Sequence, residues 1–449
     1  MISDDVPKTE WARLAFYASH VATVGVRGLF RNNKKRRISP AVWSHIGRLA
    51  SGKPLLPNLR EISWSWTSIQ CFALPHIIPP SLRHLTVSVS ITHSYDSMEN
   101  GTQESEAAFR MMLLAVFSIA PELASLAIIS AKNALAPIGK LHHLQKLTFD
   151  EHSKVNANEL HALAALRALK HLKLGQADIS GVIHPPFAGC GFNNLETLSV
   201  EFHPQTAHMY EVFSCPQLDS LDIKRYPATT SLSFHDTCQR WARSFPSLRN
   251  IHCDFVHVSH PKNDNREALG RAISPLFAIP TISSVRLGLV RSHFTVSDAD
   301  IHDIARAWPG LVTLQLSLRP PSFEQLSMAS LIHLARNCPQ LKTLHLLPLM
   351  FTQTALEDVE SFPLLDHGLR ELNIEQVRLD WEQYSLSALL LDRIFPHLDV
   401  NARDIMADPS GGSRRLERCV WLCQQARRQQ EQRVRCHAAQ DSSSLVPTV

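Results

Sequence analysis

Aliphatic residues recur along the chain in one short phrase, Leu-x-x-Leu-x-Leu, which is separated from the next copy by polar and mixed segments. The twelve copies, some with a conservative replacement, begin at Leu59, Leu82, Leu123, Leu144, Leu169, Leu195, Leu218, Leu248, Ile282, Leu311, Leu341 and Leu369. A period of about 20 to 35 residues is typical of a chain built from one repeated structural unit.

Within one copy the alternation of apolar and polar residues predicts a short strand. Leu198 and Val200 are two positions apart and would share one face, whereas Thr197 and Ser199 would share the other. Leu195 is expected to turn inward just before the strand. Parallel strands require each intervening segment to return along the opposite side.

Several of these return segments have the pattern of amphipathic helices with recognisable ends. Residues 267–277 precede Pro280, and the pattern predicts a helix there. Ser297 can cap a helix that stops at Pro309, and Ser327 can cap one that stops at Pro339.

These features predict an α/β fold, namely a leucine-rich-repeat solenoid that curves as a horseshoe, with a parallel sheet on its concave face and helices on its convex face. We expect the solenoid to occupy residues 57–407. Residues 1–56 are expected to form an N-terminal helical cap and a basic loop, with an amphipathic helix at 11–21 covering the first repeat and a second helix starting at Pro40. Residues 408–449 are expected to form a linker, a basic C-terminal helix and a tail that is disordered from Ala438.

The charge, the cysteine content and the apolar stretches of the chain indicate which partners and which cellular location to expect. The net charge is +4 over 449 residues, so attraction of the whole molecule to nucleic acid or to a membrane is not expected. Nine dispersed cysteines do not suggest a disulfide framework. The N-terminus lacks the pattern of a secretory signal, and the longest apolar stretch, residues 111–120, is too short to span a bilayer. We expect a cytoplasmic or nuclear protein.

Motifs for catalysis are absent from the sequence, which contains no Gly-x-Ser-x-Gly, no phosphate-binding glycine-rich loop with lysine and no His-Glu-x-x-His. We therefore expect no enzyme, no cofactor and no small-molecule ligand, although catalytic residues that converge from separate repeats would escape such a search.

Two groups of residues resemble metal sites. His252, Cys253 and Asp254 precede His257 and His260, but the strand alternation directs Cys253 inward and its two neighbours outward, so we expect no metal site. Cys419 and Cys423 lie one helical turn apart, and apolar packing of the end helix is the favoured interpretation.

A basic run, Lys34-Lys35-Arg36-Arg37, precedes Ser39. It could serve as a nuclear import signal, and the same run followed by Ser39 resembles a basophilic kinase site. A solvated loop in which Ser39 caps the next helix is the preferred interpretation, because short basic runs are common by chance.

The outward strand positions form the best candidate surface. Twelve strands about 4.8 Å apart would make an arc of roughly 55 Å, which suits a protein or peptide better than a small molecule. The alternative is a polar face that is merely solvated. The candidate partner-binding residues are Lys146, Asp150, His171, Lys173, Asp222, Lys224, His252, Asp254, Arg286, His345, Glu371 and Glu375.

Several phrases carry a resemblance to a known family. They are Glu10-Trp11-Ala-Arg-Leu-Ala-Phe-Tyr17-Ala18-Ser19, Ile38-Ser39-Pro40-Ala-Val-Trp43, the Cys-Pro-Gln-Leu phrases at Cys215 and Cys338, and Trp421-Leu-Cys-Gln-Gln-Ala-Arg-Arg. Together with the repeats they resemble the F-box and leucine-rich-repeat proteins of mushroom-forming fungi. The resemblance implies that the repeats select a protein substrate, while an F-box docks onto the Skp adaptor of a cullin ubiquitin ligase.

One departure limits what the resemblance implies. The F-box usually opens with a Leu-Pro-x-Glu-like phrase ahead of the helix that contains Tyr17, and residues 1–56 contain no such phrase. We expect a non-catalytic interaction scaffold that acts as a substrate-recognition subunit; the alternative is a stand-alone leucine-rich-repeat scaffold without a ligase role. A Skp-type adaptor and a cullin are expected partners only if an F-box lies upstream, and no residue is assigned to adaptor docking.

Overall fold

The computed structural model describes residues 7–25, 40–66, 74–89, 100–129, 138–150, 153–178, 191–201, 215–227, 231–256, 267–288, 294–317, 326–346, 349–350, 363–374, 381–400 and 412–443. The chain divides into two compact units. The first comprises residues 1–226 with 243–247, and the second comprises residues 227–242 with 248–449.

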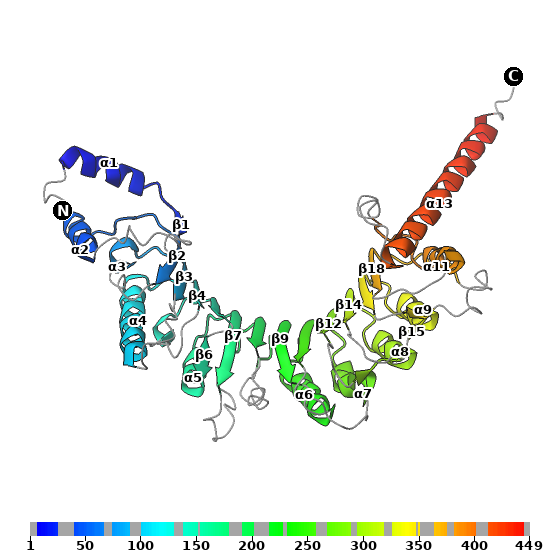
Figure 1. Ribbon diagram of the computed structural model, residues 1–449, viewed down its shortest axis with the longest axis horizontal. Coiled ribbons are helices and arrows are strands. Elements are labelled where there is room, and N and C mark those ends of the chain that lie inside the picture. Colours follow the sequence, from blue (N-terminus) through cyan, green and yellow to red (C-terminus); the bar gives the residue numbers. More distant parts are fainter. Residues whose placement is uncertain are drawn as a thin grey trace. The chain divides into compact units, whose positions relative to one another are not determined.

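The first unit contains parallel strands that lie side by side in the order of the chain (Figure 1). They are β1 (Thr23–Gly25), β2 (Glu61–Trp66), β3 (His84–Val89), β4 (Ser125–Ile129), β5 (Lys146–Phe149), β7 (His171–Asp178), β8 (Thr197–Glu201) and β9 (Ser220–Pro227), while β6 (Lys154–Asn156) pairs with β7. The segments between them include α2 (Pro40–Leu49), α3 (Leu74–Ile77), α4 (Asn100–Ile119), the 3₁₀ turn η1 (Ile138–Lys140) and α5 (Ala157–Ala164), and α1 (Lys8–Ala18) precedes β1.

The second unit repeats this plan with β10 (Asn250–Val256), β12 (Ser284–Gly288), β14 (Thr313–Ser317), β16 (Thr343–Leu346) and β18 (Glu371–Ile374), again parallel and in chain order. Its helices are α6 (Ser231–Ser244), most of which belongs to this unit, α7 (Leu269–Ile273), the 3₁₀ turn η4 (Ser274–Ala278), α8 (Asp298–Ala307), α9 (Met328–Asn337), α11 (Trp381–Ile394) and α13 (Gly412–Ser443). Two-residue strands form two further parallel pairs, β11 (Glu267–Ala268) with β13 (Phe294–Thr295) and β15 (Leu326–Ser327) with β17 (Leu349–Met350). Both units are α/β structures of successive parallel strands, consistent with a repeat solenoid.

The leucine phrases form the core. The first residue of every copy is at most 1% exposed, and the inward strand residues, such as Leu198 and Val200, are equally buried. In the second unit an aromatic cluster of Phe234, Phe255 and Phe294 adds to this core, with ring centroids 4.7 to 5.8 Å apart. The inward alternation predicted from the sequence is confirmed.

The backbone repeats as regularly as the side chains. In most copies the N–H of the first residue donates to the carbonyl three residues earlier, as from Leu123 to Ala120 and from Leu341 to Cys338. Before most strands one carbonyl accepts two N–H groups from the start of the neighbouring strand: Arg83 O, for example, accepts from Ala124 and Ser125. Because the polar backbone groups are satisfied by the neighbouring repeat, the strands can be buried on their inner side.

Two of the predicted helix starts are confirmed. Ser297 and Asp300 form a reciprocal capping box at the start of α8. The Ser327 hydroxyl accepts from Ala329 N at the start of α9, which ends at Asn337 with Cys338 as its C-cap just before Pro339.

The helix predicted over residues 267–277 is wrong in its extent. These residues form strand β11, the short helix α7 and the 3₁₀ turn η4, which carries Pro275 at its start. Proline has no N–H to continue the α-helical hydrogen bonds, which accounts for the change of helix type.

The ends also differ from expectation. Of the residues of α1, Ala18 is buried, whereas Leu14, Phe16 and Tyr17 are exposed. The edge of β2 is instead paired with β1. At the other end, α13 buries Leu416 and Val420 and continues to Ser443, past Ala438, where the sequence predicted a disordered tail. None of the helices in the described segments is both long and apolar enough to cross a membrane.

Candidate functional site

The outward residues of the first unit lie in rows because neighbouring parallel strands are in register. One row contains Lys146, His171, Thr197 and Ser220, and the next contains Thr148, Lys173, Ser199 and Asp222. Lys224 lies one row further along, beside Glu201. We call the outward residues of β5, β7, β8 and β9 the first open face. It brings Lys146, His171, Lys173, Asp222 and Lys224 together on one surface, as predicted.

Three lysines cross this face obliquely: Lys146 on β5, Lys173 on β7 and Lys224 on β9, each one row further along than the last. We call them the lysine diagonal. All three side chains are exposed. Within the described residues, none of their ammonium groups lies within ion-pair distance of a carboxylate.

The carboxylates near the lysine diagonal already accept contacts from other neighbours. Ser199 Oγ donates to Asp222 Oδ2 at 2.8 Å, and Ser153 Oγ donates to Asp150 Oδ1 at 2.6 Å. Glu201 is largely buried and pairs with Arg225, with 2.6 Å between Oε1 and Nη1. The lysines are therefore left for solvent or for a partner.

The alternation of inward and outward residues in the sequence did not predict the ion pair between Glu201 and Arg225. Arg225 follows Lys224 and would face inward in a regular strand, but its φ of 57° places it in the left-handed region. In this backbone conformation the Arg225 guanidinium remains exposed and contacts the carboxylate of Glu201 on β8. No sequence signal distinguishes an arginine with this backbone conformation.

Gly175 determines how closely β7 approaches the end of β5. The register of β7 shifts between Leu174 and Gln176, and a Cβ at Gly175 would collide with the carbonyl of Asp150. Only glycine fits this close backbone approach. The candidate Asp150 is thus placed at the edge of the first open face by the β7 irregularity.

Polar side chains also bridge neighbouring strands. His171 Nδ1 lies 2.8 Å from Thr197 Oγ1 on β8. Just before the strands, Lys170 Nζ donates to Glu196 Oε1 at 2.7 Å, and this hydrogen bond holds the pKa of Glu196 below its ordinary value. These contacts fix side chains on adjacent repeats in one orientation, which favours a preorganised surface.

The second unit has a comparable surface, the second open face, made by the outward residues of β10, β12, β14, β16 and β18. One row contains His252, Arg286, Gln315, His345 and Asn373. Glu371 accepts from Thr343 Oγ1 at 3.4 Å and lies 3.0 Å from His345 Nε2. Of the predicted residues, Glu375 lies outside the described residues.

Arg286 is the exposed cation of the second open face, and in the described part of the chain it has no carboxylate within ion-pair distance. Asp254, two strand positions from His252, lies 3.4 Å from its Nε2. A Cβ at Gly288 would collide with the Asp254 carboxylate, so glycine makes room for this contact.

The structure confirms the divergence of the suspected metal ligands. Cys253 is fully buried, whereas His252 and Asp254 face outward. Among the residues that the structure describes, no three or more His, Cys, Asp or Glu side chains gather as metal ligands would. His257, His260 and the basic run at 34–37 with Ser39 lie outside those residues.

Four of the described cysteines have thiols that are poor nucleophiles. Burial raises the pKa of Cys215 and of Cys338 to about 12, and burial also raises the pKa of Cys419 and Cys423. A thiol with a raised pKa is protonated at neutral pH and therefore weakly reactive.

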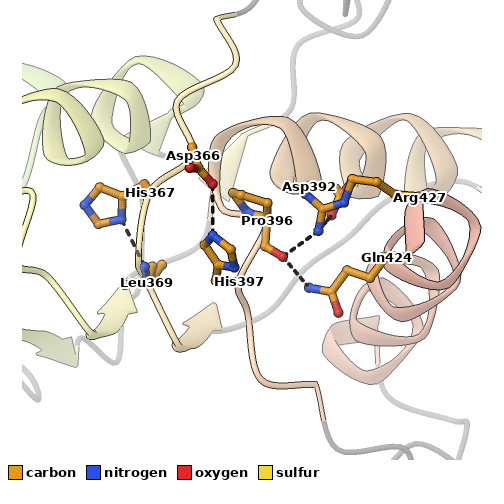
Figure 2. A network of polar contacts seen from close by, with 8 residues as sticks. All are labelled: Asp366, His367, Leu369, Asp392, Pro396, His397, Gln424 and Arg427. Carbon is orange, nitrogen blue, oxygen red and sulfur yellow. Dashed lines mark hydrogen bonds and ion pairs between the residues drawn. The ribbon is translucent and has the colours of Figure 1, made fainter. Parts of the chain in front are cut away.

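The end of the second unit is closed by polar contacts from α13 (Figure 2). Gln424 Nε2 donates to Leu398 O at 3.0 Å and Arg427 Nη2 donates to Pro396 O at 2.6 Å. A hollow of about 260 Å³ lies between β18, residues 398–400 and α13. It is smaller than ordinary small-molecule sites.

No protein-family model matches the chain, and no curated protein matches it significantly. The class that the geometry defines is an α/β protein whose successive parallel strands bury one side and expose a polar face on the other.

Proposed function

We propose that the protein is a non-catalytic leucine-rich-repeat scaffold that binds a protein partner on its open strand faces. The observation that carries the proposal is the contrast between the two sides of each strand. Leucine side chains on one side are buried, while exposed polar and charged side chains on the other lie in register across neighbouring repeats. An extended surface of this kind suits a macromolecule, because a small molecule would need a concave pocket.

The finer proposal is a substrate-recognition subunit that resembles the F-box and leucine-rich-repeat adaptors of cullin ubiquitin ligases. Its support is the set of phrases around Trp11, Pro40 and Cys338 that resemble the fungal family. In such an adaptor the repeats hold the substrate, and a Skp-type adaptor and a cullin bind elsewhere.

A stand-alone scaffold without a ligase role is the second candidate. It requires only the repeats, whereas a ligase role would also require an F-box. Both candidates use the same open faces, so they differ only in the proteins recovered alongside the partner.

Affinity purification of the full-length tagged protein from its native cells tests the shared proposal. Lys173→Glu and Arg286→Glu reverse one charge on each open face. Lys140→Glu on η1 and Arg336→Glu on α9 reverse exposed charges on the return segments and serve as controls. We expect partner proteins to be lost with the first pair and retained with the controls; equal recovery from all four would refute the open faces as the binding surface.

The same purification separates the two candidates. Recovery of a Skp-type adaptor and a cullin with wild type and with all four variants supports the ligase role. If partners are recovered without either ligase protein, the stand-alone scaffold is supported instead.

A further inference from the structure

We propose that the first open face binds an acidic peptide segment, whose carboxylates pair with the lysine diagonal of Lys146, Lys173 and Lys224. This inference rests on the proposed function and names the chemistry of the partner at one surface. A peptide segment here means a stretch of a partner protein that presents several aspartate or glutamate side chains.

The first support is the charge of the face. The three ammonium groups are exposed and have no carboxylate within ion-pair distance in the described structure, whereas the nearby carboxylates accept contacts from Ser153, Ser199 and Arg225. Carboxylates supplied by a partner could form ion pairs with the three lysines without displacing any contact that the face already makes. Complementary charge of this kind contributes to specificity and to the rate of association.

The second support is the spacing of the lysines. Lys146 and Lys173 lie on adjacent strands and one row apart, and Lys224 lies two strands and one row further on. With about 4.8 Å between strands and about 6.7 Å between rows, the Cα atoms are roughly 8 Å and then roughly 12 Å apart. Alternate residues of an extended peptide are about 6.8 Å apart and point to the same side. Acidic residues at positions i, i+2 and i+6 therefore match the lysine diagonal within the reach of the side chains.

The third support distinguishes a peptide from a nucleic acid. Asp222 lies two positions before Lys224 on β9, and Asp150 directly follows β5, so both flank the lysine diagonal and a continuous phosphate backbone would pass close to them. The outward positions of β5, β7, β8 and β9 that the structure describes include no Phe, Tyr or Trp on which bases could stack. Separate carboxylates on a peptide can contact the lysines and avoid the aspartates.

Fluorescence anisotropy with the full-length protein tests the inference. The probe is a labelled peptide with glutamate at i, i+2 and i+6 in a Gly-Ser-Ala background, and the control peptide carries glutamine at these positions. We expect the glutamate peptide to bind at least tenfold more tightly, and its affinity to fall as salt is raised from 50 to 500 mM, since exposed charge pairs are screened.

A triple variant, Lys146→Gln with Lys173→Gln and Lys224→Gln, is expected to lose at least tenfold in affinity for the glutamate peptide. Lys140→Gln, an exposed lysine outside the face, is the control and should bind as wild type does. Because all four lysines are exposed, the variants should fold, and equal thermal melting curves verify this.

Three outcomes would overturn the inference. They are a glutamate peptide that binds no better than the glutamine peptide, a triple variant that binds as wild type does, and a single-stranded oligonucleotide of the same length that binds more tightly through the same lysines. If the triple variant still retains its cellular partners while Arg286→Glu loses them, the inference fails but the proposed function stands. If the glutamate peptide binds as expected while Lys173→Glu and Arg286→Glu lose no cellular partner, the proposed function fails and the inference about acidic peptides does not.

Discussion

At the scale of single residues, carboxylates at the helix starts join neighbouring repeats. Asp298, at the start of α8, accepts hydrogen bonds from Ser327 N and from the hydroxyls of Ser327 and Ser330, all on the next repeat. Burial alone would raise the pKa of Asp298, but these hydrogen bonds hold it below its ordinary value. The charged form therefore stabilises the contact between two repeats.

This contact predicts a pH-dependent stability. A carboxyl whose pKa is lower in the folded state stabilises the fold above its unfolded pKa, and that contribution is lost as pH falls through the folded pKa. We expect Asp298→Asn to lower the melting temperature at pH 7. As pH falls below about 4, the difference from wild type should shrink, because the carboxyl of the unfolded chain is then protonated and must lose its proton on folding; the difference should vanish only when the folded Asp298 is protonated as well. A difference that stays constant from pH 7 to pH 3 would contradict this role.

The sequence correctly predicted which strand residues face inward and which face outward, because this depends only on the local alternation of side chains. Leu198 faces inward and Lys173 outward because side chains alternate along any regular strand. Arg225 escaped prediction because its position depends on a positive φ, and Gly175 because its role depends on the carbonyl of Asp150 in another repeat. Contacts between distant segments leave no periodic signal.

The two sides of one strand give a direct test of this alternation. Leu198→Asp would bury an unpaired carboxylate among stacked repeats and should cost several kcal/mol of unfolding free energy. Thr197→Asp, one position earlier on the first open face, should cost less than about 1 kcal/mol. Chemical denaturation measures both, and equal losses would refute the assignment of inside and outside.

At the scale of elements, the caps and strands were predicted better than the short pairs and the ends. Ser297 and Ser327 were recognisable because a helix cap is a local feature. The pairs β11–β13 and β15–β17 contain two residues per strand, too few for a pattern. The extent of α13 was underestimated, since residues 438–443 contain no large apolar side chain whose spacing would have indicated a longer helix.

The attachment of α13 rests on a few buried polar contacts. Gln424 is buried and donates to Leu398 O, so Gln424→Ala would leave that buried carbonyl without this donor. We expect a loss of about 1–3 kcal/mol in the local stability of the contact. Hydrogen exchange should become faster at residues 412–427. Gln429→Ala, at an exposed position of the same helix, is the control and should leave the exchange unchanged.

At the scale of the whole molecule, each unit gains its stability from contacts between successive repeats, as the shared carbonyls and the in-register rows illustrate. The recurrence of one phrase made this order of strands predictable from the sequence. The division into two units was not predictable, because the leucine phrase continues on both sides of the boundary.

The most direct test of the central claim is site-specific photo-crosslinking in native cells. A photoreactive amino acid replaces Thr148 on the first open face or Gln315 on the second, and, for comparison, His142 or Arg336 on the return segments. If the strand faces hold the partner, Thr148 or Gln315 should crosslink to a discrete protein and His142 and Arg336 should not. Crosslinks that form from the return segments alone would contradict the account.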